Sequence, residues 1–364
     1  MKTLNPKPSI LAIGIALAGL ALTTNLQAQV NVFVEGGSAS QSVLYDRATN
    51  LFAGGTFTST GTSSSTVREF QGTSLNPTLS GYGTITLDIN VANGAIAGLQ
   101  SLVNQVPGPG DTNVFGTPVV PTFVDSATSP DAVGISSAAN NLVGYPTYVV
   151  PLVYVKNSRF ADLSSVTNLT QQQAVTLETS VNKTTFFGGS SPNYVYFVGR
   201  NSQSAVRTEV DLNIYNTLSI ETFTNNSAGL PVQDTSPDPG LTSGGAVANT
   251  LLALTNSIGT VAVQNLKSTL VPLAYNGVSY SVTNVENGSY ALWGYENYYF
   301  ISSPNTGAPS APQQAVIDAF YQSVTNASFQ NINNPVFTNN FVPISALSVS
   351  RNYDGGPIIP NANY

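Results

Sequence analysis

Small and hydroxyl-bearing residues gather at three places where the sequence predicts a turn from a strand into a helix. The three turns are Gly37-Ser38-Ala39-Ser40, Asn93-Gly94-Ala95 and Ser204-Ala205-Val206-Arg207. Small side chains let a ligand approach the backbone, and the N–H groups of a first helical turn have no partner within the helix. The helix macrodipole adds about half a positive charge at each helix start. The chemistry that these turns favour is therefore the binding of an anion.

Hydroxyl groups and arginines near these turns could complete such a site. A hydroxyl donates one hydrogen bond, and a guanidinium presents a fork that matches two oxygens of one anion. The candidate side chains are those of Ser38, Ser40, Ser136, Ser137, Ser204, Arg200 and Arg207. Each alone has a simpler explanation, because a serine before a helix is commonly its N-cap and an arginine there commonly forms a surface ion pair. Only their convergence would make an anion site.

The elements that must position these residues alternate between strands and helices. Apolar runs and period-2 alternation predict strands over 30–34, 84–91, 131–137, 148–155 and 194–198, with Pro151 interrupting the fourth. Helical spacing of apolar residues predicts helices over 43–51, 96–103, 206–214 and 315–320, and Ser310 and Gln313 form a capping box before the last. This alternation indicates an α/β fold with mostly parallel strands, in which ligands bind beyond the carboxyl ends of the strands.

Two residue types with versatile chemistry are missing, because the 364 residues include no His and no Cys. Their absence excludes a Ser-His-Asp or Cys-His nucleophile, the common zinc sites, haem and iron–sulfur ligation, and disulfides. We expect no cofactor and no metal site. No two acidic residues form a recognisable glycosidase motif, so an enzyme is the least favoured class. Hydrophobic residues make up 41% of the chain and charged residues 8%, a composition that argues against disorder.

Residues 1–28 have the three-part layout of a secretory signal peptide. Two lysines precede an apolar run over 10–22, and a polar segment of small residues ends at Ala28. The apolar run is too short to span a membrane, so we expect a mature chain in the periplasm or outside the cell, without stable membrane insertion. Cleavage would remove Lys2 and Lys7 and lower the net charge from −7 to −9. Such a charge disfavours nucleic acid as a partner.

The order of these segments resembles that of the phosphate-binding proteins of ABC transporters, in the type II periplasmic binding protein superfamily. The resemblance covers most of the mature chain. It rests on the 37–40 turn, the stretch 132–137, the loop 199–207 and the segment Gly288-Ser-Tyr-Ala-Leu-Trp293. It implies an α/β fold of two lobes, with two mixed sheets flanked by helices and a hinge between them. Lobe I would comprise 29–145 and 286–364, and lobe II would comprise 146–285.

The resemblance also implies which residues hold the ligand. In that family one phosphate is enclosed between the lobes by backbone N–H groups, hydroxyls, an arginine and a carboxylate. Carried over by position, the binding residues would be Ser38, Ala39, Ser40, Asn93, Gly94, Ser136, Ser137, Arg200, Ser204, Ala205, Val206 and Arg207. Two positions depart from the family pattern, because Ser137 stands in place of an aspartate and Val206 in place of a threonine. Loss of the carboxylate predicts relaxed selectivity among small oxyanions.

Two functions remain open. The first is an exported substrate-binding protein that captures phosphate or a related small oxyanion without catalysis, with an ABC permease as its transport partner. The second is a secreted structural or adhesive protein that keeps the fold and has lost the ligand. The departures at Ser137 and Val206 favour the second, as does the stretch over 56–65, which is rich in Thr, Ser and Gly.

Overall fold

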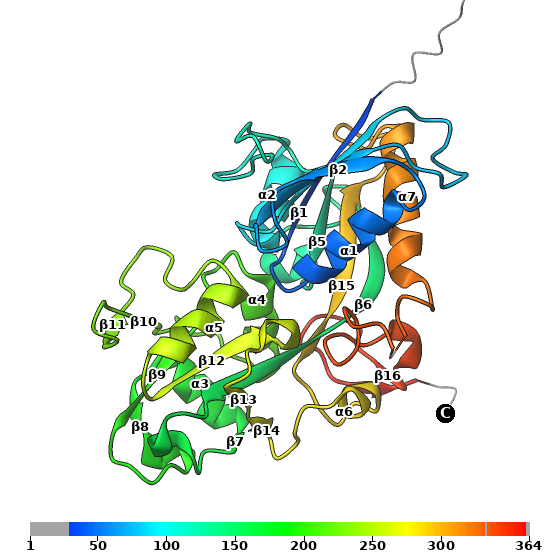
Figure 1. The fold of residues 1–364 in the computed structure, drawn as a ribbon. Helices are drawn as coiled ribbons and strands as arrows, with labels where there is room; N and C mark the ends of the chain where they lie inside the picture. Colours follow the sequence, from blue (N-terminus) through cyan, green and yellow to red (C-terminus); the bar gives the residue numbers. More distant parts are fainter. Residues whose placement is uncertain (1–28, 332, 362–364) are drawn as a thin grey trace, which may run out of the picture.

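The computed structural model describes residues 29–331 and 333–361, and Figure 1 shows its fold. The expected signal peptide over 1–28 lies outside these residues. The helices and strands form two parts, and long strands run from one part into the other (Figure 1). Within the described part of the chain, no helix is both long enough and apolar enough to cross a membrane.

The first part is built on one end of a mixed sheet. β1 (Val30–Gly36) lies between β4 (Ile85–Asn90) and β5 (Phe123–Ser126) and is parallel to both. β3 (Val67–Gly72) and β2 (Phe57–Thr60) extend the sheet beyond β4 in antiparallel pairing. Because β1, β4 and β5 are parallel, the turns that follow them meet at one edge of the sheet.

Three helices pack in this part: α1 (Gln41–Leu51), α2 (Ala95–Asn104) and α7 (Ala311–Thr325). α1 and α2 follow β1 and β4 directly, as the apolar spacing predicted. α7 begins as predicted, because Ser310 and Gln313 form a reciprocal capping box that satisfies two amide groups at the helix start.

β6 (Leu142–Asn157) runs for 16 residues and belongs to both parts. Its residues up to Pro151, except Thr147 at a bulge, pair with β15 (Trp293–Ile301), and residues 152–156 pair with β12 (Ser257–Ala262). The prediction that Pro151 would interrupt the strand was wrong. Proline has no N–H to donate, and Pro151 lies where β6 changes partner, so the missing bond breaks neither ladder.

The second part is built on the other end of the sheet. β12 lies between β6 and the parallel strand β9 (Tyr194–Val198), with β8 (Asn182–Lys183) at the edge, and β13 (Leu270–Pro272) pairs with β6. Its helices are α3 (Gln171–Thr179), α4 (Ala205–Ile214) and α5 (Gly244–Ala253). The remaining short elements are β7 (Asn168–Leu169), β10 (Phe223–Asn225), β11 (Pro231–Gln233), β14 (Ala274–Tyr275), α6 (Val282–Glu286), β16 (Val349–Ser350) and β17 (Ile359–Pro360).

The two expected mixed sheets are thus the two ends of one continuous sheet. Among the described residues, the strand order is β2-β3-β4-β1-β5-β15-β6-β12-β9-β8. β6 and β15 connect the ends, since β15 pairs with β5 on one side and with β6 on the other. This arrangement gives the two-lobed α/β architecture that the sequence predicted.

The expected buried strand over 131–137 was wrong. Pro130–Val133 form a short 3-10 helix, η1, and a largely exposed turn follows it. Pro130 favours a helical start, and Asp131 accepts a hydrogen bond from the N–H of Ser137 at 3.0 Å, which closes the turn. The buried strand in this region is β5, which lies earlier in the chain and is buried at all four positions.

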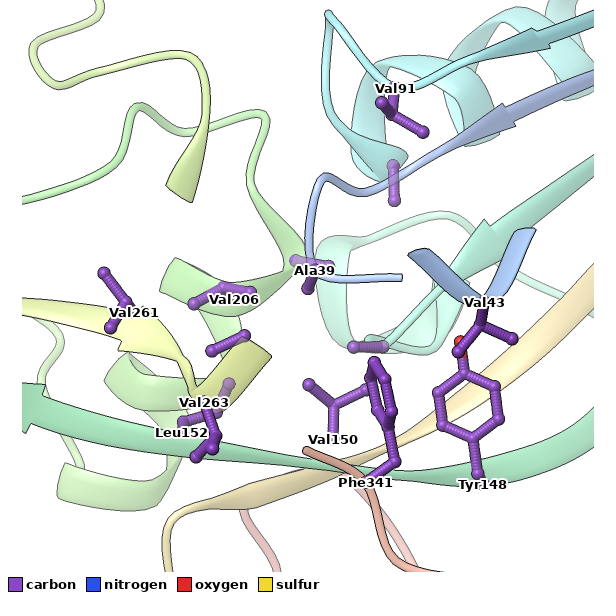
Figure 2. Close-up of a cluster of buried hydrophobic side chains, with 14 of the residues drawn as sticks. Ala39, Val43, Val91, Tyr148, Val150, Leu152, Val206, Val261, Val263 and Phe341 are labelled. Atoms are coloured by element: carbon purple, nitrogen blue, oxygen red, sulfur yellow. The ribbon is translucent and has the colours of Figure 1, made fainter. Parts of the chain in front are cut away.

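One apolar core continues from the first part into the second. Figure 2 shows Val150 and Leu152 of β6 below Ala39 of the first part and Val206 of the second. All four side chains are buried. The turns that begin α1 and α4 are therefore held near each other by packing as well as by the sheet.

Phe320 of α7 tests the packing of the first part. It is fully buried between Phe123 of β5 and Tyr298 of β15, at ring-centroid distances of 6.1 and 5.8 Å. Phe320→Ala should lower the free energy of unfolding by about 3–5 kcal/mol, because it leaves a cavity in a close-packed core. Urea denaturation followed by the fluorescence of the single tryptophan, Trp293, measures this change. Phe115→Ala is the control, since Phe115 is 71% exposed, and equal losses for the two variants would contradict the assignment.

Candidate functional site

A small cavity lies where the starts of α1, α2 and α4 meet. Its volume is about 10 Å³, room for about one water molecule. Residues from both parts of the fold line it, and they are Gly37, Ser38, Ala39, Gly94, Ala95, Ala127, Arg200, Ser204, Ala205, Val206 and Glu296. The three turns that the sequence singled out are therefore brought together around one space.

The helix starts present unpaired amide groups to this cavity. Among the described residues, the backbone N–H groups of Ala39, Ala95, Ala205 and Val206 have no protein acceptor. All four residues line the cavity. The positive end of a helix dipole and free donors thus converge from three helices, which is the arrangement that binds an anion.

Gly94 allows the two parts to approach each other at the cavity. Its φ is +92°, a region that residues with a side chain rarely adopt. A Cβ atom there would lie 2.3 Å from the carbonyl oxygen of Gln203, in the loop before α4. The N–H of Ile96 donates to that same carbonyl at 3.2 Å. Glycine is therefore required for this contact between the lobes.

Arg200 supplies a buried positive charge. Its side chain is 3% exposed and donates to the carbonyl oxygens of Leu241 (3.0 Å) and Thr242 (2.8 Å) and to Oγ of Ser38 (3.4 Å). Burial lowers the pKa of Arg200 to about 10, so the guanidinium stays charged at neutral pH. In the described part of the chain, the ion pairs involve Arg47 and Arg207. Arg200 therefore has no carboxylate to balance its charge.

Two serine hydroxyls lie beside Arg200. Ser38 Oγ accepts from the N–H of Gly244, at the start of α5, at 3.0 Å. Ser204 is the N-cap of α4, and its Oγ accepts from the N–H of Arg207 at 3.2 Å. Because these contacts use the hydroxyls as acceptors, each O–H can still donate to a ligand.

Three predicted residues lie next to the cavity and do not line it. Ser40 donates to the carbonyl of Gly37 at 3.1 Å and also to Asp125. The side chain of Asn93 donates to Asp111 at 3.2 Å. Arg207 forms an ion pair with Asp211 at 3.4 Å, within α4. These side chains support the turns, whereas the lining is made by their neighbours in the sequence.

Ser136 and Ser137 lie away from the cavity, in the turn that follows η1. Oγ of Ser136 accepts from the N–H of Ala139 at 3.2 Å, and the N–H of Ser137 is bonded to Asp131. The loop that reaches the cavity from this region is the one directly after β5, where Ala127 is a lining residue. The run of Phe123, Val124 and Asp125 before the small residues 126–127 was the available signal for this turn.

Glu296 is the lining residue that sequence reasoning missed. It lies on β15 at a bulge, where the pairing with β6 shifts between Glu296 and Asn297. Its side chain is 1% exposed and contacts the carboxyl group of Asp125. Burial, and then the neighbouring Asp125, raise the pKa of Glu296 well above its usual range. A carboxyl group thus lies beside the cavity, where none was expected from the sequence.

Residues 29–331 and 333–361 place no three His, Cys, Asp or Glu side chains together in a way that could hold a metal ion. The cavity therefore offers amide and hydroxyl donors, one unpaired guanidinium and one carboxyl group. Groups of these kinds are able to hold an oxyanion by hydrogen bonds and charge.

Comparison with known proteins supports the fold. Neither the family models nor the curated proteins gave a match to the sequence. A structure described as a phosphate ABC transporter substrate-binding protein with bound phosphate, from Clostridium perfringens, matches with a TM-score of 0.60 at 12% identity, over 86% of this chain and 99% of that chain. An ABC-type phosphate transport receptor from Vibrio cholerae matches with a TM-score of 0.51 at 13% identity, over 82% and 96%. Both similar structures are binding proteins, and the chain has the type II periplasmic binding protein fold.

Proposed function

We propose that this chain is an exported substrate-binding protein that captures phosphate or a related small oxyanion between its lobes, for uptake by an ABC-type transporter. The observation that carries the proposal is the buried charge of Arg200, which has no carboxylate partner and faces a cavity ringed by free amide groups. A buried charge without a partner is costly, so an anion at this place is stabilising.

The lobes in this proposal are 29–145 with 286–364, and 146–285. Ser38, Gly94 and Glu296 line the cavity from the first lobe, and Arg200 and Ser204 line it from the second. The cavity of about 10 Å³ is smaller than a tetrahedral oxyanion, which has several heavy atoms. The described conformation is therefore closed, and the ligand reaches the site when the lobes separate about β6 and β15.

The acidic composition does not oppose this function. Charges farther away than about 8 Å are largely screened at physiological ionic strength, whereas amide groups and a guanidinium act at contact distance. Hydrogen bonds in which one partner is charged are also about twice as strong as neutral ones. The groups at the cavity therefore outweigh the net charge of the surface.

Arg200→Gln tests the charge at the site. The variant should weaken phosphate binding tenfold or more, because a hydrogen bond to a charged group contributes about 1.5–3 kcal/mol. Calorimetric titration with phosphate, arsenate and sulfate measures the affinity, and thermal unfolding without ligand checks that the variant folds. Arg159→Gln is the matched control, since Arg159 is exposed and should keep wild-type affinity.

Two outcomes of that titration would contradict the proposal. No heat and no thermal shift with any of the three anions on the wild-type chain would favour the structural or adhesive alternative. Equal affinity of the wild-type chain and the Arg200→Gln variant would place the binding site elsewhere.

Gly94→Ala tests closure of the lobes. The new Cβ would strain a backbone with φ of +92° and meet the carbonyl of Gln203, so the closed state loses stability. The clash with the Gln203 carbonyl arises only when the lobes are together, so it should weaken affinity by about tenfold or more, which corresponds to about 1.4 kcal/mol. Gly81→Ala is the control, because nothing lies within 4 Å of a Cβ at Gly81. Calorimetry measures the affinity of each variant, and small-angle scattering reports whether the lobes close. Similar affinities for the two variants would count against the role of the contact between Gly94 and Gln203.

A further inference from the structure

Asp125 and Glu296 form a buried pair of carboxyl groups behind the cavity. Asp125 is the third residue of β5 and is fully buried, while Glu296 reaches it from the neighbouring strand β15. The two groups interact directly through their side chains. Glu296 also lines the cavity, so the pair connects the interior of the first lobe with the ligand site.

Neither carboxyl group is balanced by a cation. The ion pairs in the described part of the chain do not include Asp125 or Glu296. Oδ1 of Asp125 and Oε2 of Glu296 are buried, and no donor in that part of the chain reaches them. Two ionised carboxylates in contact would repel each other in a medium of low dielectric constant. A proton on one of the two groups removes this repulsion, and a second proton on the other makes the pair neutral.

The surroundings indicate which group holds the proton. Ser40 donates a hydrogen bond to Asp125 and so favours its ionised form, and Glu296 has no such donor among the described residues. Burial raises the pKa of Asp125 to about 7 and that of Glu296 further above its usual range. Glu296 is therefore the protonated member, and a neutral acid group faces the cavity.

Several other titratable or charged groups surround this pair. The groups that face the pair are Tyr148 of β6, Tyr298 and Tyr299 of β15, Glu209 of α4 and Arg200 at the cavity. Farther out, Glu209 faces Arg351 and Asp354, and Tyr298 faces Arg47. Burial raises the pKa of all three tyrosines, away from neutral pH, and it raises the pKa of Glu209 as well. Asp125, whose raised pKa is about 7, is therefore the group whose charge we expect to change near neutral pH.

We propose that Asp125 and Glu296 are a carboxyl pair that couples oxyanion capture to protonation of Asp125. This inference rests on the proposed function. A neutral pair leaves the positive charge of Arg200 unopposed, and the site then attracts an anion. When Asp125 ionises, a negative charge lies one side chain away from the cavity and opposes the ligand. Anion binding and proton uptake therefore favour each other, as linkage requires.

The direction of the pH dependence follows from this coupling. Asp125 keeps its proton below pH 7 and loses it above. Affinity for a fully ionised anion should therefore be constant below about pH 7 and fall above it, by up to about tenfold per pH unit for one coupled proton. In this proposal the protonation state of the protein, and not that of the anion, decides whether the anion binds. A fully ionised anion therefore binds when the carboxyl pair is neutral.

Sulfate is the probe for this test, because it stays fully ionised between about pH 6 and 8.5, where phosphate itself titrates. Calorimetry in two buffers of different ionisation enthalpy gives both the affinity and the protons taken up per anion. For the wild-type chain we expect uptake that rises toward one proton above pH 7, together with the loss of affinity. Binding without proton uptake and with constant affinity would overturn the coupling and leave the proposed function intact. No binding of sulfate, phosphate or arsenate at any pH would overturn both.

Two variants assign the proton to the pair. Asp125→Asn removes the group that titrates near pH 7, so sulfate affinity should become independent of pH over the same range. Glu296→Gln keeps the shape of a protonated glutamate and still donates to Asp125, so the pH dependence should remain; this outcome is informative even if Asp125→Asn fails to fold. Asp88→Asn is the matched control: Asp88 also has a raised pKa, about 6, but lines a separate cavity with Glu69. The control should keep the wild-type pH dependence, and a pH dependence that survives in Asp125→Asn, or is lost in Glu296→Gln, would overturn the assignment.

Discussion

The structure around the cavity depends on one constraint: the guanidinium of Arg200 is buried without a negative partner. Two backbone carbonyls and the hydroxyl of Ser38 hold it in place, and they satisfy its hydrogen bonds without neutralising its charge. In a medium of low dielectric constant that charge acts strongly on its neighbours. Three helix starts add partial positive charge to the same space. A neutral ligand would leave this positive field unbalanced, so the proposed preference for an anion rests on the fold itself and does not depend on which anion binds.

β6 and β15 connect the two lobes, and β15 also carries Glu296, which lines the cavity. They run between the lobes, so a hinge motion must bend them. The bulge on this strand pair lies at Glu296, and the hydroxyl of Thr147 donates to the Glu296 carbonyl at 2.9 Å. The extra residue of this bulge is Thr147 of β6, so the local twist of the strand pair increases beside Glu296. Since β15 pairs with β5 next to Asp125, the proposed hinge motion would leave the carboxyl pair with the first lobe and move Arg200 with the second.

Local patterns predicted the parts of the site that depend on local geometry. Gly37-Ser38-Ala39, Gly94 and Ser204-Ala205-Val206 line the cavity because a small residue at a helix start is a property of a few adjacent positions. The loop after β5 was placed too late in the sequence, since Ser136 and Ser137 looked like the end of a strand and the shorter strand before Ala127 was overlooked. Glu296 could not be found in this way. Its contact with Asp125 is made by antiparallel pairing of strands far apart in the chain, with a bulge that no local pattern encodes.

The formal net charge of −7 overstates the negative charge that a ligand meets. Glu35, Glu178, Glu209 and Glu296 are all buried, and burial raises the pKa of each well above its usual range. Burial thus favours the neutral form of these four groups, because an isolated charge in the interior loses its hydration. An acidic composition and the proposed anion site are therefore compatible, since burial works against the negative charge of these glutamates.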